Sequence, residues 1–242
     1  MLERILDYER ALFLKMNGAH SMFGDQFMWL FSGFSVWIPA VVCFFTILLY
    51  ANRERWKEML LIVGAIILVI VLTDQFSSGL CKPFFSRFRP THHPDFMHVV
   101  STVFNYRGGR YGFISSHAAN GFGFATLTSL IFKNRYYTIL LMSWATVSAY
   151  SRIYLGVHFI SDIIPGIITG LFFGWTVYQL FAFVHNKMIR HQVISCPNER
   201  SEAMYPNRGL SLFIAIMIAT VILIVIVGML YAFQIIPSIG IK

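Results

Sequence analysis

Residues 151–162 read Ser-Arg-Ile-Tyr-Leu-Gly-Val-His-Phe-Ile-Ser-Asp and place a cation, an imidazole and a carboxylate directly before a long apolar run. Ionisable side chains cost free energy at the start of a membrane helix, so they usually mark a functional site there. His158 and Asp162 are four residues apart, and a helix would put them on one face, where the carboxylate can orient the imidazole. A bend at Gly156 would bring Arg152 to the same place. The stretch therefore predicts an anion-binding site at a membrane surface.

The composition is that of an integral membrane protein. Of the 242 residues, 57% are hydrophobic and 12% are charged, whereas soluble domains carry about a quarter charged residues. The net charge of +8 comes from Lys and Arg in short loops between apolar runs, which is typical of the positive-inside rule and not of a nucleic-acid surface. Three cysteines indicate no disulfide framework. The N-terminus lacks the pattern of a cleaved signal peptide.

Apolar runs predict an all-α, polytopic membrane helix bundle of about six transmembrane helices. Residues 2–17 are amphipathic but too polar to span, so we expect an interfacial helix. Pro39 is expected to kink the first span, and the Pro- and Gly-containing residues 81–112 are expected to form an irregular loop. The polar residues 185–208 form a linker before the last span. The expected spans are residues 27–51, 59–80, 115–132, 136–150, about 151–184, and 209–233.

The basic residues predict which side of the membrane each turn occupies. Lys and Arg concentrate in three alternate turns, which we place in the cytoplasm: residues 52–58, 133–135 and 185–208. Lys82, Arg89 and Arg152 then fall on the opposite face. We therefore expect a protein of the plasma (inner) membrane whose site opens on the extracytoplasmic side. The basic residues of the N-terminal helix count against placing that helix outside.

Two further polar islands accompany residues 151–162. Residues 82–90 read Lys-Pro-Phe-Phe-Ser-Arg-Phe-Arg-Pro, and residues 113–121 read Phe-Ile-Ser-Ser-His-Ala-Ala-Asn-Gly. In this order and spacing the chain resembles the type 2 phosphatidic acid phosphatase superfamily, which is also that of the vanadium haloperoxidases. The positions that match its three-part signature are Lys82, Arg89, Pro90, Ser115, His117, Ser151, Arg152, His158 and Asp162.

The chain departs from the signature in its second part. Ile114 stands where the superfamily has proline, and Ser116 stands where it has glycine. In the superfamily that glycine offers a backbone amide to the phosphate, and a serine keeps the amide while adding a hydroxyl. The resemblance therefore still implies a phosphate contact at Ser116.

The resemblance also implies a role for each matched side chain. His158 would attack phosphorus to give a phosphohistidine, while Asp162 orients the imidazole. His117 would protonate the leaving oxygen and later activate water. The phosphate charge would be held by cations and by the amides at a helix N-terminus. The implied phosphate-binding residues are Lys82, Arg89, Ser115, Ser116 and Arg152.

Acidic residues are too scarce for a metal-dependent phosphatase. Asp95 and Asp162 are the only ones from residue 81 to residue 162, whereas a two-metal site needs several bridging carboxylates and glycoside hydrolysis needs a pair. We expect neither a metal nor a cofactor. One alternative is a metal cluster in the loop, although loop histidines are more often solvated; its members would be His92, His93, Asp95 and His98.

We expect residues 1–242 to form one membrane-embedded phosphatase domain, with the signature in 82–162 and an extra C-terminal span over about 209–233. The expected partners are a membrane lipid phosphate and the bilayer, not nucleic acid. The compact chain lacks a soluble insertion for a bulky sugar headgroup, which favours undecaprenyl or another polyprenyl diphosphate. Lipid A, phosphatidylglycerol phosphate and phosphatidic acid stay open as substrates.

Readings of other classes also stay open. A haloperoxidase would share the signature and hold vanadate, and a transporter could bind a lipid phosphate without cleaving it. A single His and Asp pair at this spacing is more often structural. Arg87 is expected to anchor a helix end at lipid headgroups, and Asp74 is either a pocket residue or an interfacial one.

Overall fold

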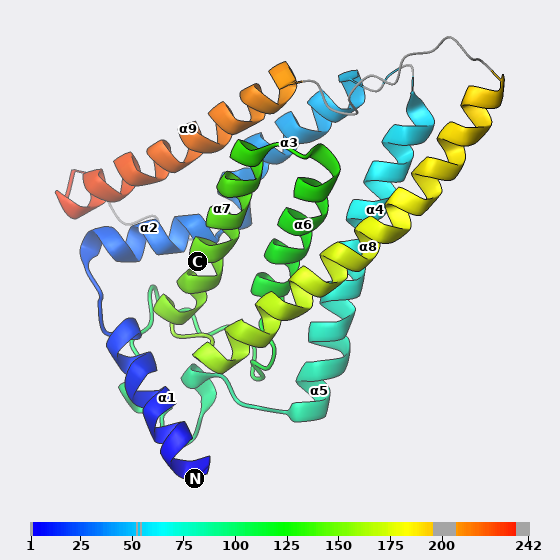
Figure 1. Ribbon diagram of the computed structural model, residues 1–242. Coiled ribbons are helices and arrows are strands. Elements are labelled where there is room, and N and C mark those ends of the chain that lie inside the picture. Colours follow the sequence, from blue (N-terminus) through cyan, green and yellow to red (C-terminus); the bar gives the residue numbers. More distant parts are fainter. Residues whose placement is uncertain (1, 52, 54, 196–206, 236–242) are drawn as a thin grey trace.

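The computed structural model describes residues 2–51, 53, 55–195 and 207–235. These residues form helices and connecting loops without a strand (Figure 1), which confirms the predicted all-α fold. An isolated bridge joins Phe88 to Tyr111. The α-helices are α1 (Leu2–Asn17), α2 (Met22–Ser32), α3 (Phe34–Ala51), α4 (Trp56–Asp74), α5 (Lys82–Phe85), α6 (Ser116–Phe132), α7 (Arg135–Tyr154), α8 (Ile160–Ser195) and α9 (Asn207–Ala232). Shorter π and 3₁₀ turns are η1 (Gln75–Cys81), η2 (Pro90–His92) and η3 (Met97–Val99).

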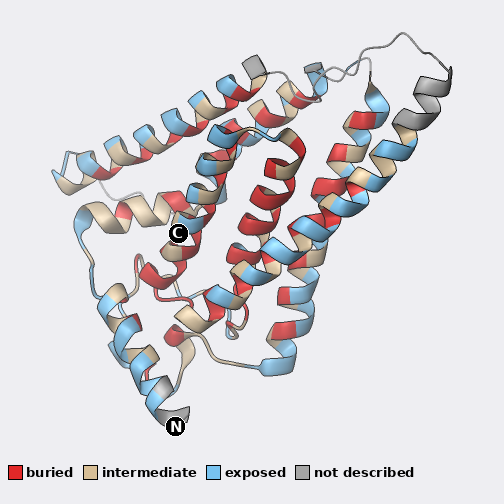
Figure 2. Cartoon of the chain, in the orientation of Figure 1, coloured by how far each residue is buried: buried red, intermediate tan, exposed pale blue. Residues whose placement is uncertain are grey.

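Helix α6 forms the centre of the bundle and packs against α4, α7 and α8. Figure 2 shows it as the most continuously buried helix. The close packing of α8 on α6 depends on small residues, as is common between membrane helices. A Cβ atom on Gly170 would lie 2.5 Å from the Ala119 carbonyl oxygen, and one on Gly174 would lie 2.8 Å from the Gly123 carbonyl oxygen. The glycines at 166, 170 and 174 recur every four residues, so they share one face of α8.

Part of the membrane prediction is confirmed. Three helices among the described residues are long and apolar enough to cross a membrane, and the bent pair α2 and α3 makes a fourth if it counts as one span. The three are Trp56–Phe85, Ile160–Met188 and Gly209–Ala232. Helices α6 and α7 are shorter or more polar, so the count of six spans is not confirmed.

The first predicted span is broken, but not where the sequence suggested. The axes of α2 and α3 differ by 45°, and the break falls at Gly33, whose extended backbone (φ −76°, ψ 134°) ends α2. Pro39 lies inside α3, which continues through it. A kink at Pro39 stays a prediction, and the break at Gly33 was not expected from the sequence. Glycine leaves a helix at little cost because its helical state is entropically expensive.

The second span runs further than predicted. Helix α4 continues through the π-helical turn η1 into α5, so Lys82 lies on the helical segment and not in a loop. π-Turns of this kind often occur at functional sites. The irregular loop begins only after Phe85 and carries η2 and η3 on its way to α6.

A tight turn, and not a continuous helix, connects α7 to α8. Gly156 has a φ of +76°, the left-handed conformation that glycine tolerates best. Its amide donates to the Ile153 carbonyl at 2.9 Å, and a Cβ there would lie 2.7 Å from the Ser101 carbonyl oxygen. The prediction of one helix through His158 and Asp162 is therefore wrong, because His158 lies in the turn and Asp162 in the first turn of α8.

Helix α1 covers this turn. The Asn17 amide donates to the carbonyl oxygens of Tyr154 at 2.9 Å and Ser101 at 3.0 Å. Phe13 is fully buried and packs its ring against Phe96 and Phe159. The predicted helix over residues 2–17 is confirmed, and its interfacial position stays a prediction. At the other end of the chain, the first part of the predicted linker is helical as far as Ser195, and residues 196–206 lie outside the described residues.

Candidate active site

Residues from all three sequence islands meet beside the turn between α7 and α8. The clearest marker is Gly112, which has no side chain and lies in the middle of them. A Cβ on Gly112 would lie 3.0 Å from Asp162 Oδ2, 3.1 Å from Arg89 Cγ and 3.6 Å from His158 Nδ1. His158 and Asp162 therefore lie within the space of one methyl group of Arg89.

His158 and Asp162 come together through the turn. His158 Nδ1 lies 3.4 Å from Asp162 Oδ2, and both side chains are almost fully buried. The same Oδ2 accepts a hydrogen bond from the Phe159 amide at 3.0 Å. The His158 amide donates to the Arg152 carbonyl at 3.3 Å, which ties the turn to the end of α7. The carboxylate therefore faces the imidazole as an ion-pair partner for its protonated form, although among the described residues Nδ1 has no hydrogen-bond partner.

The surroundings of His158 keep its imidazole neutral. Burial lowers the pKa of His158 well below its usual value, and the positive charges of Arg89, Arg152 and Lys82 lower it further. Two of these cations, Lys82 and Arg89, belong to residues 82–90, and Arg152 belongs to the same island as His158. A neutral imidazole keeps the lone pair that a nucleophile needs.

Arg152 is a buried cation with an unused donor. Its side chain is only 3% exposed, and its Nη2 donates to the Tyr106 hydroxyl at 3.1 Å. Its Nε has no hydrogen-bond partner among the residues that the structure describes. Because an unsatisfied buried donor is costly, and more so on a charged group, this guanidinium indicates an anion as its missing partner.

Arg89 is held by the loop backbone. Its amide donates to the Arg110 carbonyl at 3.1 Å, and its Nε donates to the Tyr111 carbonyl at 3.0 Å. Gly108 has a φ of +66°, and a Cβ there would lie 2.5 Å from Arg89 Nη1. This glycine therefore lets the guanidinium lie across the loop.

Two serine hydroxyls accept hydrogen bonds from the Lys82 side chain. Its Nζ donates to Ser78 Oγ at 2.9 Å and also to Ser116 Oγ. Ser78 belongs to η1, and its hydroxyl donates to Asp74 Oδ1 at 3.3 Å. These contacts favour Asp74 as a residue of the pocket over Asp74 as an interfacial residue. The hydroxyl that replaces the expected glycine at position 116 thus binds the lysine of the first island.

The N-terminus of α6 completes the anion-binding side. Ser115 caps the helix, accepting a hydrogen bond from the Ala118 amide at 3.5 Å, and its own amide donates to the Asp162 carbonyl at 3.0 Å. The first amides of a helix lack partners within it and carry its positive dipole end. The next two amides belong to Ser116 and His117, so the second island presents amides and an imidazole together.

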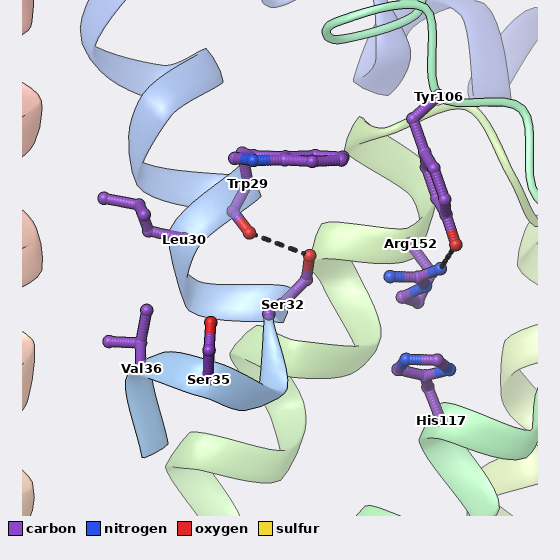
Figure 3. Close-up of a pocket in the computed structure, with 9 residues that line it drawn as sticks. Trp29, Leu30, Ser32, Ser35, Val36, Tyr106, His117 and Arg152 are labelled. Atoms are coloured by element: carbon purple, nitrogen blue, oxygen red, sulfur yellow. Dashed lines mark hydrogen bonds between the residues drawn. The ribbon is translucent and has the colours of Figure 1, made fainter. Parts of the chain in front are cut away.

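His117 lies next to Arg152 and Tyr106 at the wall of a cavity of about 210 Å³ (Figure 3). It also lines a larger, mainly apolar cavity of about 500 Å³ between α3, α4, α6, α7 and α9. Its imidazole therefore borders both cavities, and it shares the wall of the smaller one with Arg152.

Arg87 is part of the site, and the prediction that it anchors lipid headgroups is wrong. Its Nη1 donates to Asp162 Oδ1 at 2.9 Å, and its Nη2 donates to Glu9 Oε2 at 2.8 Å. Its guanidinium also lies 4.8 Å from the centre of the Phe159 ring. The signal was the spacing of two between Arg87 and Arg89, because alternate residues of an extended segment point to one side. Nothing in the sequence indicated Glu9.

The histidine-containing loop does not form the alternative metal site. No group of three or more His, Cys, Asp or Glu side chains in the described parts of the chain is arranged to hold a metal ion. His93 lies near Arg10 and packs edge-on against Phe96. These contacts attach the loop to α1.

A comparison with protein families identifies the chain. The family model of the PAP2 superfamily matches residues 63–185, which include every island of the site. The chain belongs to the PAP2 superfamily. The predicted resemblance to type 2 phosphatidic acid phosphatases is thereby confirmed.

Two curated relatives of similar length are named lipid A 4'-phosphatase. A lipid A 4'-phosphatase from Porphyromonas gingivalis is 44% identical over 212 residues, which cover 88% of this chain and 87% of the relative. A lipid A 4'-phosphatase from Bacteroides thetaiotaomicron is 38% identical over 189 residues, which cover 78% of this chain and 81% of the relative. The chain is therefore a phosphatase, as predicted.

Two solved structures share the PAP2 fold. LpxE from Aquifex aeolicus superposes with a TM-score of 0.52 at 25% identity and covers 70% of this chain and 93% of its own. The second structure is the first transmembrane PAP2 type phosphatidylglycerolphosphate phosphatase from Bacillus subtilis. It superposes with a TM-score of 0.51 at 18% identity, and the match covers 76% of this chain and 87% of that chain. The apolar helices of membrane length, together with the fold shared with a transmembrane phosphatase, confirm that the chain is an integral membrane protein.

The comparisons do not support the preference for a polyprenyl diphosphate. That preference assumed that a sugar headgroup needs a soluble insertion. The relatives named lipid A 4'-phosphatase match most of this chain at similar length, so the assumption fails.

Proposed function

We propose that this PAP2 enzyme removes a phosphate monoester from a sugar of lipid A, or of a similar phosphorylated glycolipid, on the extracytoplasmic side of the inner membrane. The observation that carries the proposal is the 44% identity to a lipid A 4'-phosphatase across 88% of the chain. The cationic site beside the α7–α8 turn supports it, because a phosphomonoester carries nearly two negative charges at neutral pH.

In this proposal the phosphate accepts a hydrogen bond from the Arg152 Nε, which has no other partner among the described residues. Arg89 and Lys82 neutralise the remaining charge, and the amides of Ser116 and His117 contribute at the α6 N-terminus. Phosphoryl transfer depends mainly on such positioning and charge stabilisation. The hydroxyl of Ser116 holds Lys82 toward this site.

The reaction would proceed in two steps. His158 Nε2 attacks phosphorus because Nδ1 faces Asp162, forming a P–N bond as the P–O bond to the sugar breaks. The bound phosphate dianion offsets the positive charge around His117, and the protonated imidazole then gives its proton to the departing sugar oxygen. Neutral His117 then takes a proton from water, whose oxygen attacks phosphorus and breaks the P–N bond. Inorganic phosphate leaves, and His158 is regenerated with its lone pair.

The test is phosphate release by the purified, detergent-solubilised protein from a lipid panel. The panel is lipid A carrying a 4'-phosphate, phosphatidic acid, phosphatidylglycerol phosphate and undecaprenyl diphosphate. We expect the highest kcat/KM on the sugar phosphate, and His158→Ala and His117→Ala should each lose nearly all activity. Faster release from undecaprenyl diphosphate would overturn the proposed substrate, and full activity in His158→Ala would overturn the mechanism.

A further inference from the structure

The bend between α2 and α3 forms a pocket beside His117, shown in Figure 3 and called here the leaving-group pocket. Its volume is about 210 Å³. The chain contributes to it from both sides of Gly33, with residues of the end of α2, the start of α3 and the loop before α6. Its lining side chains are Trp29, Leu30, Ser32, Ser35, Val36, Tyr106, His117 and Arg152.

The position of this pocket follows from the proposed reaction. His117 protonates the departing oxygen, so the alcohol that carries this oxygen must lie on the His117 side of the phosphate. The leaving-group pocket is bounded by His117 and by Arg152, the cation with the unpartnered Nε. A group bonded to a phosphate at Arg152 would therefore enter it.

The lining of the pocket combines aromatic rings with hydroxyls. Trp29 is fixed edge-to-face between Phe104 at 5.5 Å and Tyr106 at 5.4 Å between ring centres. Ser32 Oγ donates to the Trp29 carbonyl at 3.2 Å, which leaves its lone pairs free to accept, and Ser35 is exposed. A sugar ring has apolar C–H faces that pack on aromatic rings and a rim of hydroxyls that donate and accept.

The larger cavity lies next to this pocket, because His117 and Ser32 line both of them. Aromatic and aliphatic side chains dominate its wall, including Phe31, Trp37, Phe44, Phe124, Trp144 and Met217. Cations, a pocket with two serines and an apolar cavity thus lie next to one another. This order matches a phosphate, a sugar and an acyl chain of one glycolipid.

We infer that the leaving-group pocket binds the sugar ring that carries the phosphate and that Trp29 determines selectivity for it. The inference rests on the proposed function. Trp29→Ala removes the aromatic surface, and Ser35→Leu fills the pocket from an exposed position. Trp56→Ala is the matched control, because Trp56 is 55% exposed at the start of α4 and lies outside the pocket.

The experiment compares kcat/KM for lipid A 4'-phosphate with kcat/KM for phosphatidic acid of matched acyl length. We expect Trp29→Ala and Ser35→Leu to lower this ratio about tenfold and Trp56→Ala to leave it within twofold. An unchanged ratio in both pocket variants, while the wild type prefers the sugar lipid, overturns the pocket alone. A wild type that releases phosphate from neither lipid overturns the proposed function itself.

A second inference concerns Glu9 on α1 and is carried by a separate set of contacts. Glu9 Oε2 accepts from Arg87 Nη2 at 2.8 Å, and Glu9 Oε1 accepts from the Ser161 amide at 3.0 Å and from the Ser161 hydroxyl. Arg87 Nη1 reaches Asp162 Oδ1 at 2.9 Å. The order Glu9, Arg87, Asp162, His158 therefore forms one chain of polar contacts from α1 to the imidazole.

Glu9 binds one terminal nitrogen of Arg87, which leaves the other nitrogen for Asp162. With Nη2 held by Glu9, only Nη1 is directed to Asp162 and it takes Oδ1, so Oδ2 remains opposite His158 Nδ1. Without Glu9, Arg87 is free to bind both oxygens in the bidentate geometry that guanidinium and carboxylate prefer. We infer that Glu9 is a positioning residue that keeps Asp162 Oδ2 available to His158.

The test uses Glu9→Gln, which keeps the size of the side chain and an acceptor for Ser161. Arg10→Ala is the control, because Arg10 also joins α1 to the loop, through His93 and Phe96, without reaching Asp162. We expect about a tenfold lower kcat with KM within twofold for Glu9→Gln, the pattern of an interaction needed in the transition state, and near-normal kcat for Arg10→Ala. Equal losses in both variants, or a change in KM alone, would mean that Glu9 only attaches α1.

Discussion

The glycine face of α8 allows a sharp test of how packing supports the site. Gly170→Ala would place a Cβ 2.5 Å from the Ala119 carbonyl oxygen and 2.9 Å from the Gly123 amide nitrogen. Both are backbone atoms of α6, so no side chain can turn away and the helices must separate. Gly64→Ala in α4 is the matched control, because a Cβ there meets no atom within 4 Å.

The two variants should move stability in opposite directions. Overpacking costs about 1–3 kcal/mol, and the gain in helix propensity returns about 0.5–1 kcal/mol. Gly170→Ala should therefore lose about 0.5–2 kcal/mol, whereas Gly64→Ala should gain about 0.5–1 kcal/mol. For a chain of this size the two Tm values should differ by about 2–12 °C.

The assay is thermal unfolding in detergent followed by circular dichroism, with phosphate release measured below the transition. Activity of Gly170→Ala should fall further than its folded fraction, because α8 carries Asp162, α6 begins at Ser116, and the Ser115 amide bonds the Asp162 carbonyl at 3.0 Å. Equal Tm shifts in Gly170→Ala and Gly64→Ala would refute the close packing of α6 and α8.

Three further predictions test individual parts of the site. Arg152→Lys should lower kcat/KM by at least about tenfold in phosphate-release assays, because an ammonium lacks the Nε donor and the planar fork of the guanidinium; near-normal kcat/KM would show that the free Nε does not bind the substrate. Folding lowers the pKa of His158, so below pH 6.5 the unfolded chain binds a proton that the folded chain does not. As the pH falls, the free energy of unfolding of the wild type should decrease by up to about 1.4 kcal/mol per pH unit from this residue. His158→Gln should show a shallower pH dependence of unfolding, and an identical slope would contradict the neutral imidazole. A single cysteine placed in the loop between residues 91 and 110 should react with an impermeant reagent from outside intact cells, and labelling only after lysis would contradict the proposed side of the membrane.

The sequence predicted the local features of the fold, namely the helices and the spacing of the polar residues. Apolar runs of membrane length predicted the helices, because a chain in lipid must satisfy its backbone hydrogen bonds within each segment. Ser115 was expected at the start of the third predicted span, and it caps α6. The spacing within each polar island predicted the side chains of the candidate site without any knowledge of where the islands meet.

The relations between distant segments were decided by the tertiary structure. The sequence put His158 and Asp162 on one helix, but Gly156 ends α7 and the two side chains meet across a turn. Pro39 was the stronger local signal for a kink, yet the break lies at Gly33 and opens the pocket beside His117. Both outcomes depend on how neighbouring helices pack, which local propensity does not encode.

The sequence by itself determined which groups are charged, which segments are apolar and how the three islands are spaced, because these properties depend only on nearby residues. Only the tertiary structure decided that Glu9 reaches Arg87 across 78 positions of the chain and that Arg152 retains a buried donor without a partner. The physical reason is that ion pairs and desolvation depend on distances in space, and these distances exist only once α1, α6, α7 and α8 have packed together.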